Sequence, residues 1–255
     1  TKKVATYLQS NRLKNQASAI LRADAKVRYN QFGTRTGRLT TQKSSFPILT
    51  LNKEFRTAIL PNNDYFLELD FNGAEVRTLL GLLEKPQPAG DVHDFHLREI
   101  FTTLRDRDDA KVAFFAGLYG SRSAANKETS EILKTFYQKG VLLDKYYDGD
   151  TVVTPYGKHI LSVSPHHALN YLVQSTAAEL TLKQALKIEH LLRTQSAGSE
   201  VAFIIHDAVV LDMKKEDEHL LGGIASLMSS TNFGTFRINM SKGATLGTMQ
   251  EFHNG

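Results

Sequence analysis

The pattern of hydrophobic and polar residues divides the first part of the chain into predicted helices, a strand and a loop. Residues 4–22 carry apolar side chains at roughly helical spacing, and residues 26–45 are polar and rich in Gly, Thr, Ser, Arg and Gln. The first segment is therefore predicted to be a helix, and the second a long loop or irregular hairpin. The apolar run at residues 65–70 predicts a strand, and the spacing of residues 73–80 predicts a helix after it.

A break at Pro86, Pro88 and Gly90 separates these elements from the rest of the chain. Because proline and glycine interrupt regular structure, the break indicates a boundary between subdomains. Helices are predicted beyond it at residues 92–101, 106–119, 128–138 and 168–193, and strands at residues 151–154, 201–205, 209–213 and 236–240. Together they predict an α+β (mixed α/β) fold: a small antiparallel sheet with helices around it and a helical insertion in the middle.

The composition narrows the class of protein. The chain has 255 residues, 41% of them hydrophobic, which suits one large domain or two small ones. It has no cysteine, which excludes disulfides and thiolate zinc sites. The sequence has no uninterrupted apolar run of about 18 residues, so we expect no membrane partner. The net charge of +4 weakly favours a polyanion such as nucleic acid.

Asp70 and Asp207 each follow an apolar, strand-like run. Strand ends of one sheet can bring two carboxylates together, and carboxylates from separate elements are what a pair of Mg²⁺ ions needs for phosphoryl transfer. Aspartate also commonly begins a turn after a strand, so either residue alone has this ordinary explanation.

Four residues recur at every fourth position of the predicted helix 106–119: Arg107, Lys111, Phe115 and Tyr119. They lie along one helical face, with two cations followed by two aromatic rings. Cations suit the phosphates of a nucleoside triphosphate, and flat rings suit its base and sugar. A solvated basic end followed by aromatic core residues would produce the same pattern.

Two further segments carry polar side chains suited to nucleic acid. The loop 34–41 contains two arginines, four threonines and a glycine, which can hold phosphates. Asn170 and Gln174 lie one turn apart on the long helix, and amides can read minor-groove acceptors. A solvated loop and exposed amides are the ordinary alternatives.

The order of these segments resembles the family A DNA polymerases, the DNA polymerase I type. The matching segments are TRTGRLTT at 34–41, LDFNGAEVR at 69–77, RDDAKVAFFAGLYG at 107–120, TPYGKHI at 154–160, LNYLVQSTAAEL at 169–180 and IIHDAVV at 204–210. Asp70–Arg77 is similar to motif A, with a phage-like variant at Asn72 and Gly73. Residues 107–120 resemble motif B, the fingers helix, and His206–Asp207 resemble the core of motif C.

The resemblance implies a right-hand polymerase architecture that lacks most of the thumb. The palm would comprise residues 1–85, with an N-terminal helix leading from the missing thumb, and residues 160–255. The fingers would comprise residues 86–159. The chain would start too late for a thumb or a proofreading domain, so we expect low processivity and no editing.

The resemblance also assigns roles at the reaction centre. Asp70, Asp207 and the backbone carbonyl of Phe71 would bind two Mg²⁺ ions, for which Mn²⁺ could substitute. Arg107 and Lys111 would bind the triphosphate, and Lys111 would protonate the leaving pyrophosphate.

Other residues would contact the incoming nucleotide and the DNA. Phe115 would pack against the sugar and base and disfavour dideoxynucleotides, and Glu75 would exclude a ribose 2′-OH. The resemblance adds nucleotide contacts at Tyr119, His93, Asn72 and Gly73, and DNA contacts at Arg38, Asn170, Gln174, His206 and Lys158. The implied partners are primer-template DNA and deoxynucleoside triphosphates, bound by a monomer in the cytoplasm of a bacterial or phage-infected cell. A location in an organelle is not excluded by the resemblance, and the resemblance does not identify processivity or helicase partners.

The sequence departs from the family pattern at two positions. Ala208 stands where motif C usually has a third carboxylate, and His166 stands where the family often has an arginine. Two rival functions stay open, only the second of which rests on these departures. A single-subunit RNA polymerase shares a similar fingers helix, although Glu75 argues against it. A polymerase fold that only binds nucleic acid would fit the missing carboxylate.

Overall fold

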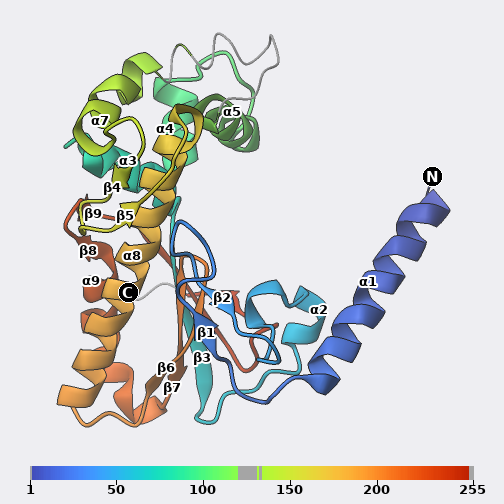
Figure 1. Cartoon of the computed structure of the whole chain (residues 1–255). Coiled ribbons are helices and arrows are strands. Elements are labelled where there is room, and N and C mark those ends of the chain that lie inside the picture. Colours follow the sequence, from blue (N-terminus) through green and yellow to red (C-terminus); the bar gives the residue numbers. More distant parts are fainter. Residues whose placement is uncertain (1, 120–130, 132–133, 253–255) are drawn as a thin grey trace.

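A five-stranded sheet, in which each strand runs antiparallel to its neighbours, lies at the centre of the computed structural model (Figure 1). The structure describes residues 2–119, 131 and 134–252. From edge to edge the strands are β11 (Gln250–Glu251), β10 (Ile238–Gly243), β3 (Tyr65–Phe71), β7 (Ala208–Met213) and β6 (Glu200–Ile205).

The middle strand, β3, is buried on both faces. Successive side chains of a strand point to opposite faces. Leu67 and Leu69 join one apolar cluster, whereas Phe66 joins another cluster together with Val210 of β7. Because both faces are covered, β3 is an almost continuous apolar run rather than an alternating one, and Glu68 and Asp70 interrupt it near its end.

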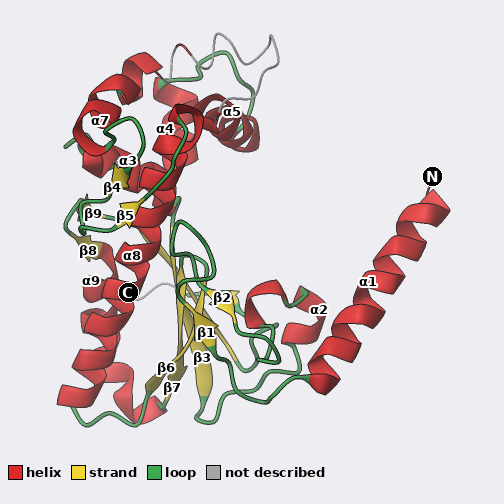
Figure 2. Cartoon of the chain, in the orientation of Figure 1, coloured by secondary structure: helices red, strands yellow, loops and turns green. Residues whose placement is uncertain are grey.

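The long helices cover one face of the sheet, and loops with short helices and a short hairpin cover the other (Figure 2). The helices α8 (Pro165–Thr194) and α9 (Leu221–Ser229) pack on the face that holds Leu67 and Leu69. The opposite face lies against a short 3₁₀ turn, η1 (Ile48–Thr50). The remaining elements beside the sheet are the hairpin β1 (Tyr29–Asn30) and β2 (Thr40–Thr41), α2 (Lys53–Arg56), η2 (Lys215–Leu220), and the ribbon β8 (Ser230–Thr231) and β9 (Gly234–Thr235).

A second group of helices lies beyond one end of the sheet, at the top of Figure 1. It consists of α3 (Ala74–Leu82), α4 (Val92–Glu99), α5 (Arg107–Tyr119), the helical residues 134–137, α7 (Lys139–Tyr146), and the ribbon β4 (Val152–Val153) and β5 (His159–Ile160). Val76, Phe114 and Tyr137 form its core together with Leu172 of α8. The long helix α8 thus packs against both the sheet and the upper group. A polar helix, α1 (Lys2–Arg22), projects away from this body (Figure 1).

The predicted α+β fold is confirmed, and so is the antiparallel sheet with its helical insertion. The predicted strand at residues 236–240 is wrong at its boundary, because β10 begins at Ile238. Phe236 instead turns into the core, and its N–H donates to the carbonyl of Ser229. Of the helix predicted at 128–138, residues 131 and 134–137 are helical, and the rest lies outside the described residues. The division at residues 85 and 159 stays a prediction.

Among the described helices, the short α2 and the longer α7 and α9 were not predicted from the sequence pattern. The α9 segment LGGIASLMS contains two glycines, which disfavour a helix. Its Leu221, Ile224 and Met228 are buried against the sheet, and this packing outweighs the low propensity. The α7 helix buries Leu142 in the upper core.

Candidate active site

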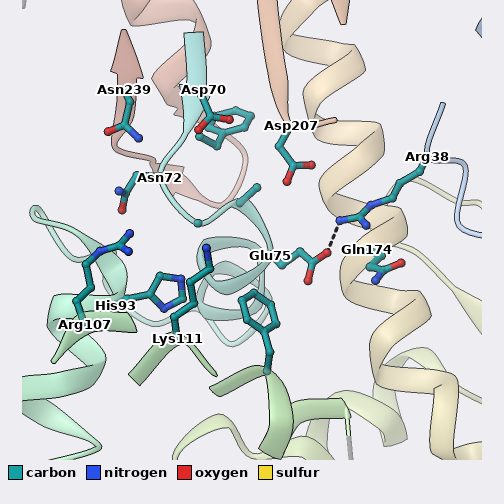
Figure 3. A pocket seen from close by; sticks show the side chains of 14 residues that line it. Arg38, Asp70, Asn72, Glu75, His93, Arg107, Lys111, Gln174, Asp207 and Asn239 are labelled. Atoms are coloured by element: carbon teal, nitrogen blue, oxygen red, sulfur yellow. Dashed lines mark hydrogen bonds and ion pairs between the residues drawn. The ribbon is translucent and has the colours of Figure 1, made fainter. Parts of the chain in front are cut away.

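An open cavity lies where the sheet meets the upper group of helices (Figure 3). It is lined by residues from β3, β10, α3, α4, α5 and α8 and from the loops beside them. They are Arg38, Asp70, Phe71, Asn72, Gly73, Ala74, Glu75, His93, Arg107, Lys111, Phe115, Gln174, Asp207 and Asn239. Twelve of these fourteen were predicted as site residues from the sequence, and Ala74 and Asn239 were not.

Asp70 and Asp207 reach the cavity from adjacent strands. Asp70 is the last residue but one of β3, and it pairs with Ala208, the first residue of β7. Asp207 lies in the two-residue turn between β6 and β7, where His206 has a left-handed φ of 57°. The hairpin therefore ends level with Asp70, and the predicted convergence of the two carboxylates is observed.

Both carboxyl groups have raised pKa values. Burial raises the pKa of Asp70 to about 7, and the negative charges of Asp207 and Glu68 add to the effect while Lys111 opposes it. Burial also raises the pKa of Asp207, against the opposing charges of Arg38 and His206. Two half-buried carboxylates of this kind are strained when ionised together, and a bound cation would relieve that strain.

The donor atoms at this end of the sheet fit magnesium. Carboxylate oxygens are hard ligands, and Mg²⁺ is commonly held by only one or two of them together with substrate phosphates. Within the described ranges, no group of three or more His, Cys, Asp or Glu residues is placed to hold a metal. This matches the presence of Ala208, whose side chain lies beside Asp70 where a third carboxylate could have been.

A tight turn after β3 brings the second group of side chains to the cavity. Gly73 has a φ of 70°, and a Cβ on it would lie 2.4 Å from Cγ1 of Val92. Glycine is therefore required there, because it lets the start of α4 approach the turn. Glu75 follows in the first turn of α3 and is 8% exposed. Its carboxylate pairs with the guanidinium of Arg38, as the dashed line in Figure 3 shows.

The first turns of α5 supply a cationic wall, and the start of α4 places His93 beside it. Arg107, Lys111 and Phe115 all line the cavity, which confirms that they share one helical face. In Figure 3, Arg107 and Lys111 point toward the end of the sheet, and His93 lies between them. Arg107 donates from Nη2 to Oδ2 of Asp91 at 2.9 Å.

His93 is held neutral. It is 3% exposed, and burial together with the charge of Arg107 lowers its pKa to about 4. Its buried Nδ1 has no hydrogen-bond partner among the described residues. A neutral imidazole facing a cationic wall can donate a hydrogen bond to a ligand without adding a charge.

Four predicted residues lie elsewhere. Asn170 is half-buried on α8, one turn before Gln174, and its Oδ1 is buried without a hydrogen-bond partner in the described part of the chain. His206 is exposed and borders a neighbouring small cavity with Arg38. Lys158 lies in the turn between β4 and β5, with its Nζ against Gly37. Tyr119 ends α5, but its side chain lies outside the described residues.

Besides Ala74, the sequence reasoning missed Asn239 and Asp91 as candidates. Asn239 lines the cavity from β10 because it pairs directly with Asp70 on the side opposite Ala208. The strand was predicted, but its register could not be. Asp91 caps α4 and contacts Arg107, and its position directly before a helical run is the signal that could have marked it.

An antiparallel sheet that ends in two carboxylates, faced by a helix with two cations and an aromatic ring, is the palm and fingers of a right-hand polymerase fold. A family model described as DNA polymerase family A matches residues 1–250. The chain therefore belongs to DNA polymerase family A, as its motifs indicated.

The chain is similar to two curated DNA polymerase I proteins. It is 22% identical to that of Geobacillus stearothermophilus over 258 residues, which cover 82% of this chain and 30% of the relative. It is 21% identical to that of Bacillus caldotenax over 247 residues, covering 78% of this chain and 28% of the relative. The chain thus spans less than a third of the length of these relatives.

A solved structure shares the fold. The POL domain of Pol1 from M. smegmatis, in complex with DNA primer-template and dNTP, superposes with a TM-score of 0.79 at 16% identity. The match covers 96% of this chain and 53% of that one. No helix in the part of the chain that the structure describes is long and apolar enough to cross a membrane.

Proposed function

We propose that the chain is a template-directed DNA polymerase, which adds deoxynucleotides to a primer 3′-OH. The observation that carries this proposal is the single cavity that Asp70 and Asp207 share with Arg107, Lys111 and Phe115. Carboxylates on one wall and cations with an aromatic ring on the other suit a nucleoside triphosphate bound through metal ions.

Asp70, Asp207 and the backbone carbonyl of Phe71 would hold two Mg²⁺ ions, or Mn²⁺ in their place. Bound there, the metal would activate the primer hydroxyl and neutralise charge on the phosphates. The residues fit this use, because two half-buried carboxyl groups with raised pKa values are a favourable place for a divalent cation.

The helix α5 would bind the triphosphate. Arg107 and Lys111 would contact its phosphates, and Lys111 would donate a proton to the departing pyrophosphate oxygen. Phe115 would pack against the sugar and base, and the neutral His93 would donate a hydrogen bond near the β-phosphate. Tyr119 would lie beside the templating position.

The turn after β3 would select the sugar. Glu75 is 8% exposed at the cavity wall, and its bulk would leave no room for a ribose 2′-OH. Asn72 and Gly73 would shape the same wall. The proposed primer-template contacts are Arg38, Asn170, Gln174, His206 and Lys158.

A second candidate function is nucleic-acid binding without catalysis. The observation in its favour is Ala208 beside Asp70, since this position lacks the third carboxylate. The proposed polymerase activity is preferred because Asp70, Asp207, Arg107 and Lys111 still line one cavity. A protein that only bound nucleic acid would have no need of two partly buried carboxylates with raised pKa values.

Primer extension tests the proposal. A labelled primer on a DNA template is incubated with dNTPs and Mg²⁺, with Asp207→Ala alongside. Extension by the wild type that disappears in the variant supports a metal-dependent polymerase. Tight primer-template binding without extension supports the second candidate.

We propose DNA replication as the role, in the cytoplasm and as a monomer, with repair as the other use of the same chemistry.

A further inference from the structure

Asp91 lies where three elements meet. Its Oδ1 accepts hydrogen bonds from the backbone N–H groups of His93 at 2.8 Å and Asp94 at 3.1 Å, which caps α4. Its Oδ2 accepts from Nδ2 of Asn72 at 2.8 Å and from Nη2 of Arg107 at 2.9 Å. One carboxylate thus joins the start of α4, the turn after β3 and the start of α5.

Several hydrogen bonds hold the Asn72 side of this junction in place. Oδ1 of Asn72 accepts a hydrogen bond from the backbone N–H of Val92 at 3.0 Å. Arg77, which is 0% exposed, donates from Nε to the carbonyl of Asn72 at 2.7 Å and from Nη2 to the carbonyl of Gly90 at 2.7 Å. The residues on both sides of Asp91 are therefore tied to the turn that follows Asp70 and Phe71.

The Arg107 side of the junction is more exposed. The side chain of Arg107 is 40% exposed, whereas that of Asp91 is 15% exposed. An arginine side chain has many rotamers, and holding it in one of them costs entropy at the moment a ligand binds. A fixed carboxylate that already orients the guanidinium removes part of that cost.

We propose that Asp91 is a positioning residue for triphosphate binding, because its Oδ2 orients the guanidinium of Arg107 at the cavity wall and links it to the Asn72 turn. The inference rests on the triphosphate-binding part of the proposed function. It assigns to Asp91 no contact with the nucleotide itself.

Asp108 provides a matched comparison. It also accepts a hydrogen bond from Arg107, from Nη1 at 3.1 Å, but its side chain is 86% exposed and it follows Arg107 directly on α5. Exposed ion pairs of this kind contribute little. Asp108 is also separate from the Asn72 turn, whose amide nitrogen donates to Asp91 instead. Neutralising Asp108 therefore changes the charge near Arg107 without removing its link to the palm.

The test compares Asp91→Asn with Asp108→Asn. Asparagine caps a helix about as well as aspartate, so α4 keeps its cap, but its amide nitrogen cannot accept from Asn72 and Arg107. Two readouts are used: KM and kcat for a dNTP in primer extension, and thermal stabilisation by inorganic tripolyphosphate. For Asp91→Asn we expect KM and the tripolyphosphate concentration needed for half-stabilisation to rise about tenfold, with kcat changed less than about threefold. Asp108→Asn should stay within about twofold of the wild type.

A double-mutant cycle separates positioning from a general structural effect. In an Arg107→Ala background, Asp91→Asn should weaken tripolyphosphate binding no further, because the group it orients is gone. Asp91→Ser, which also caps a helix, is the second variant in case the first unfolds.

Three results would overturn the inference: Asp91→Asn behaving like Asp108→Asn, full additivity with Arg107→Ala, or no tripolyphosphate stabilisation of the wild type. A wild type that shows the expected binding pattern but extends no primer would instead refute the proposed polymerase activity and leave the role of Asp91 standing.

Discussion

Arg38, from the loop before the sheet, pairs with Glu75 in the first turn of α3. The two residues are 37 positions apart in the sequence, and their side chains are 37% and 9% exposed. The pair closes one wall of the cavity and joins a proposed DNA contact to the proposed sugar-selecting residue. It raises the question of whether bulk or charge at position 75 does the selecting.

Glu75→Ala is expected to admit ribonucleotides. Removing the side chain opens the wall where a 2′-OH would lie, so discrimination against rNTPs should fall by about 10–100-fold. Glu75→Gln is the control, because it keeps the bulk but loses the ion pair with Arg38. The measurement is incorporation of rNTP against dNTP on a primed template. Equal loss of selectivity in both variants would show that the ion pair, rather than the bulk, sets it.

Asp70→Asn is expected to raise the stability of the fold and to abolish activity. The pKa of Asp70 is raised to about 7, so the folded chain retains a proton that the unfolded chain releases between about pH 4 and 7. Ionised Asp70 therefore destabilises the fold at higher pH. At pH 8 without divalent metal, the variant should be more stable by about 1–2 kcal/mol, and it should not extend a primer.

Added Mg²⁺ should make the wild type the more stable of these two proteins. The wild type is expected to gain thermal stability as Mg²⁺ is added, because only the folded chain brings the two carboxylates together. Asp70→Asn should gain little. Thermal unfolding across a Mg²⁺ titration checks both statements, and an equal response of the two proteins would argue against a metal site at Asp70.

Gly73→Ala is expected to loosen the junction between the sheet and α4. A Cβ would meet Val92 at 2.4 Å, and the φ of 70° is unfavourable for alanine. We expect a loss of about 1–3 kcal/mol in the free energy of unfolding. Gly140→Ala is the control, because a Cβ added to Gly140 in α7 would meet no atom within 4 Å. The free energies of unfolding of both variants come from chemical denaturation, and similar values would contradict the close approach.

Acid is expected to weaken the upper core through His96. This histidine is 0% exposed, stacks on Phe114 with ring centroids 4.6 Å apart, and makes a hydrogen bond with the hydroxyl of Tyr137. Burial and the charge of His93 lower its pKa to about 3. Between about pH 6.5 and 4 the unfolded chain takes up a proton that folded His96 does not bind, so stability falls by about 1.4 kcal/mol per pH unit.

His96→Gln should remove that part of the slope, and the exposed His190→Gln should not. The measurement is the free energy of unfolding from urea titrations at several pH values in this window. His93, whose pKa is lowered to about 4, contributes a second slope that both variants retain. A His96→Gln protein with the wild-type slope would contradict the account.

The sequence alone determined the helices and strands that carry the site, and the family to which the chain belongs, although it did not reveal α7 or α9. The apolar run at residues 65–70 and the four-residue spacing of Arg107, Lys111 and Phe115 are local patterns. The sequence reveals such patterns directly, because the spacing of side chains along the chain matches the repeat of a strand or a helix. The carboxylates Asp70 and Asp207 could be predicted to meet because both end strands of one sheet.

The tertiary structure decided which side chains share the cavity. Asn239 reaches it only because β10 pairs with β3 in a register that places it opposite Asp70. The Arg38–Glu75 pair and the junction at Asp91 join residues from separate elements, and no local pattern encodes such contacts. Register and turn geometry depend on the packing of the whole chain, which is why they become visible only in the folded protein.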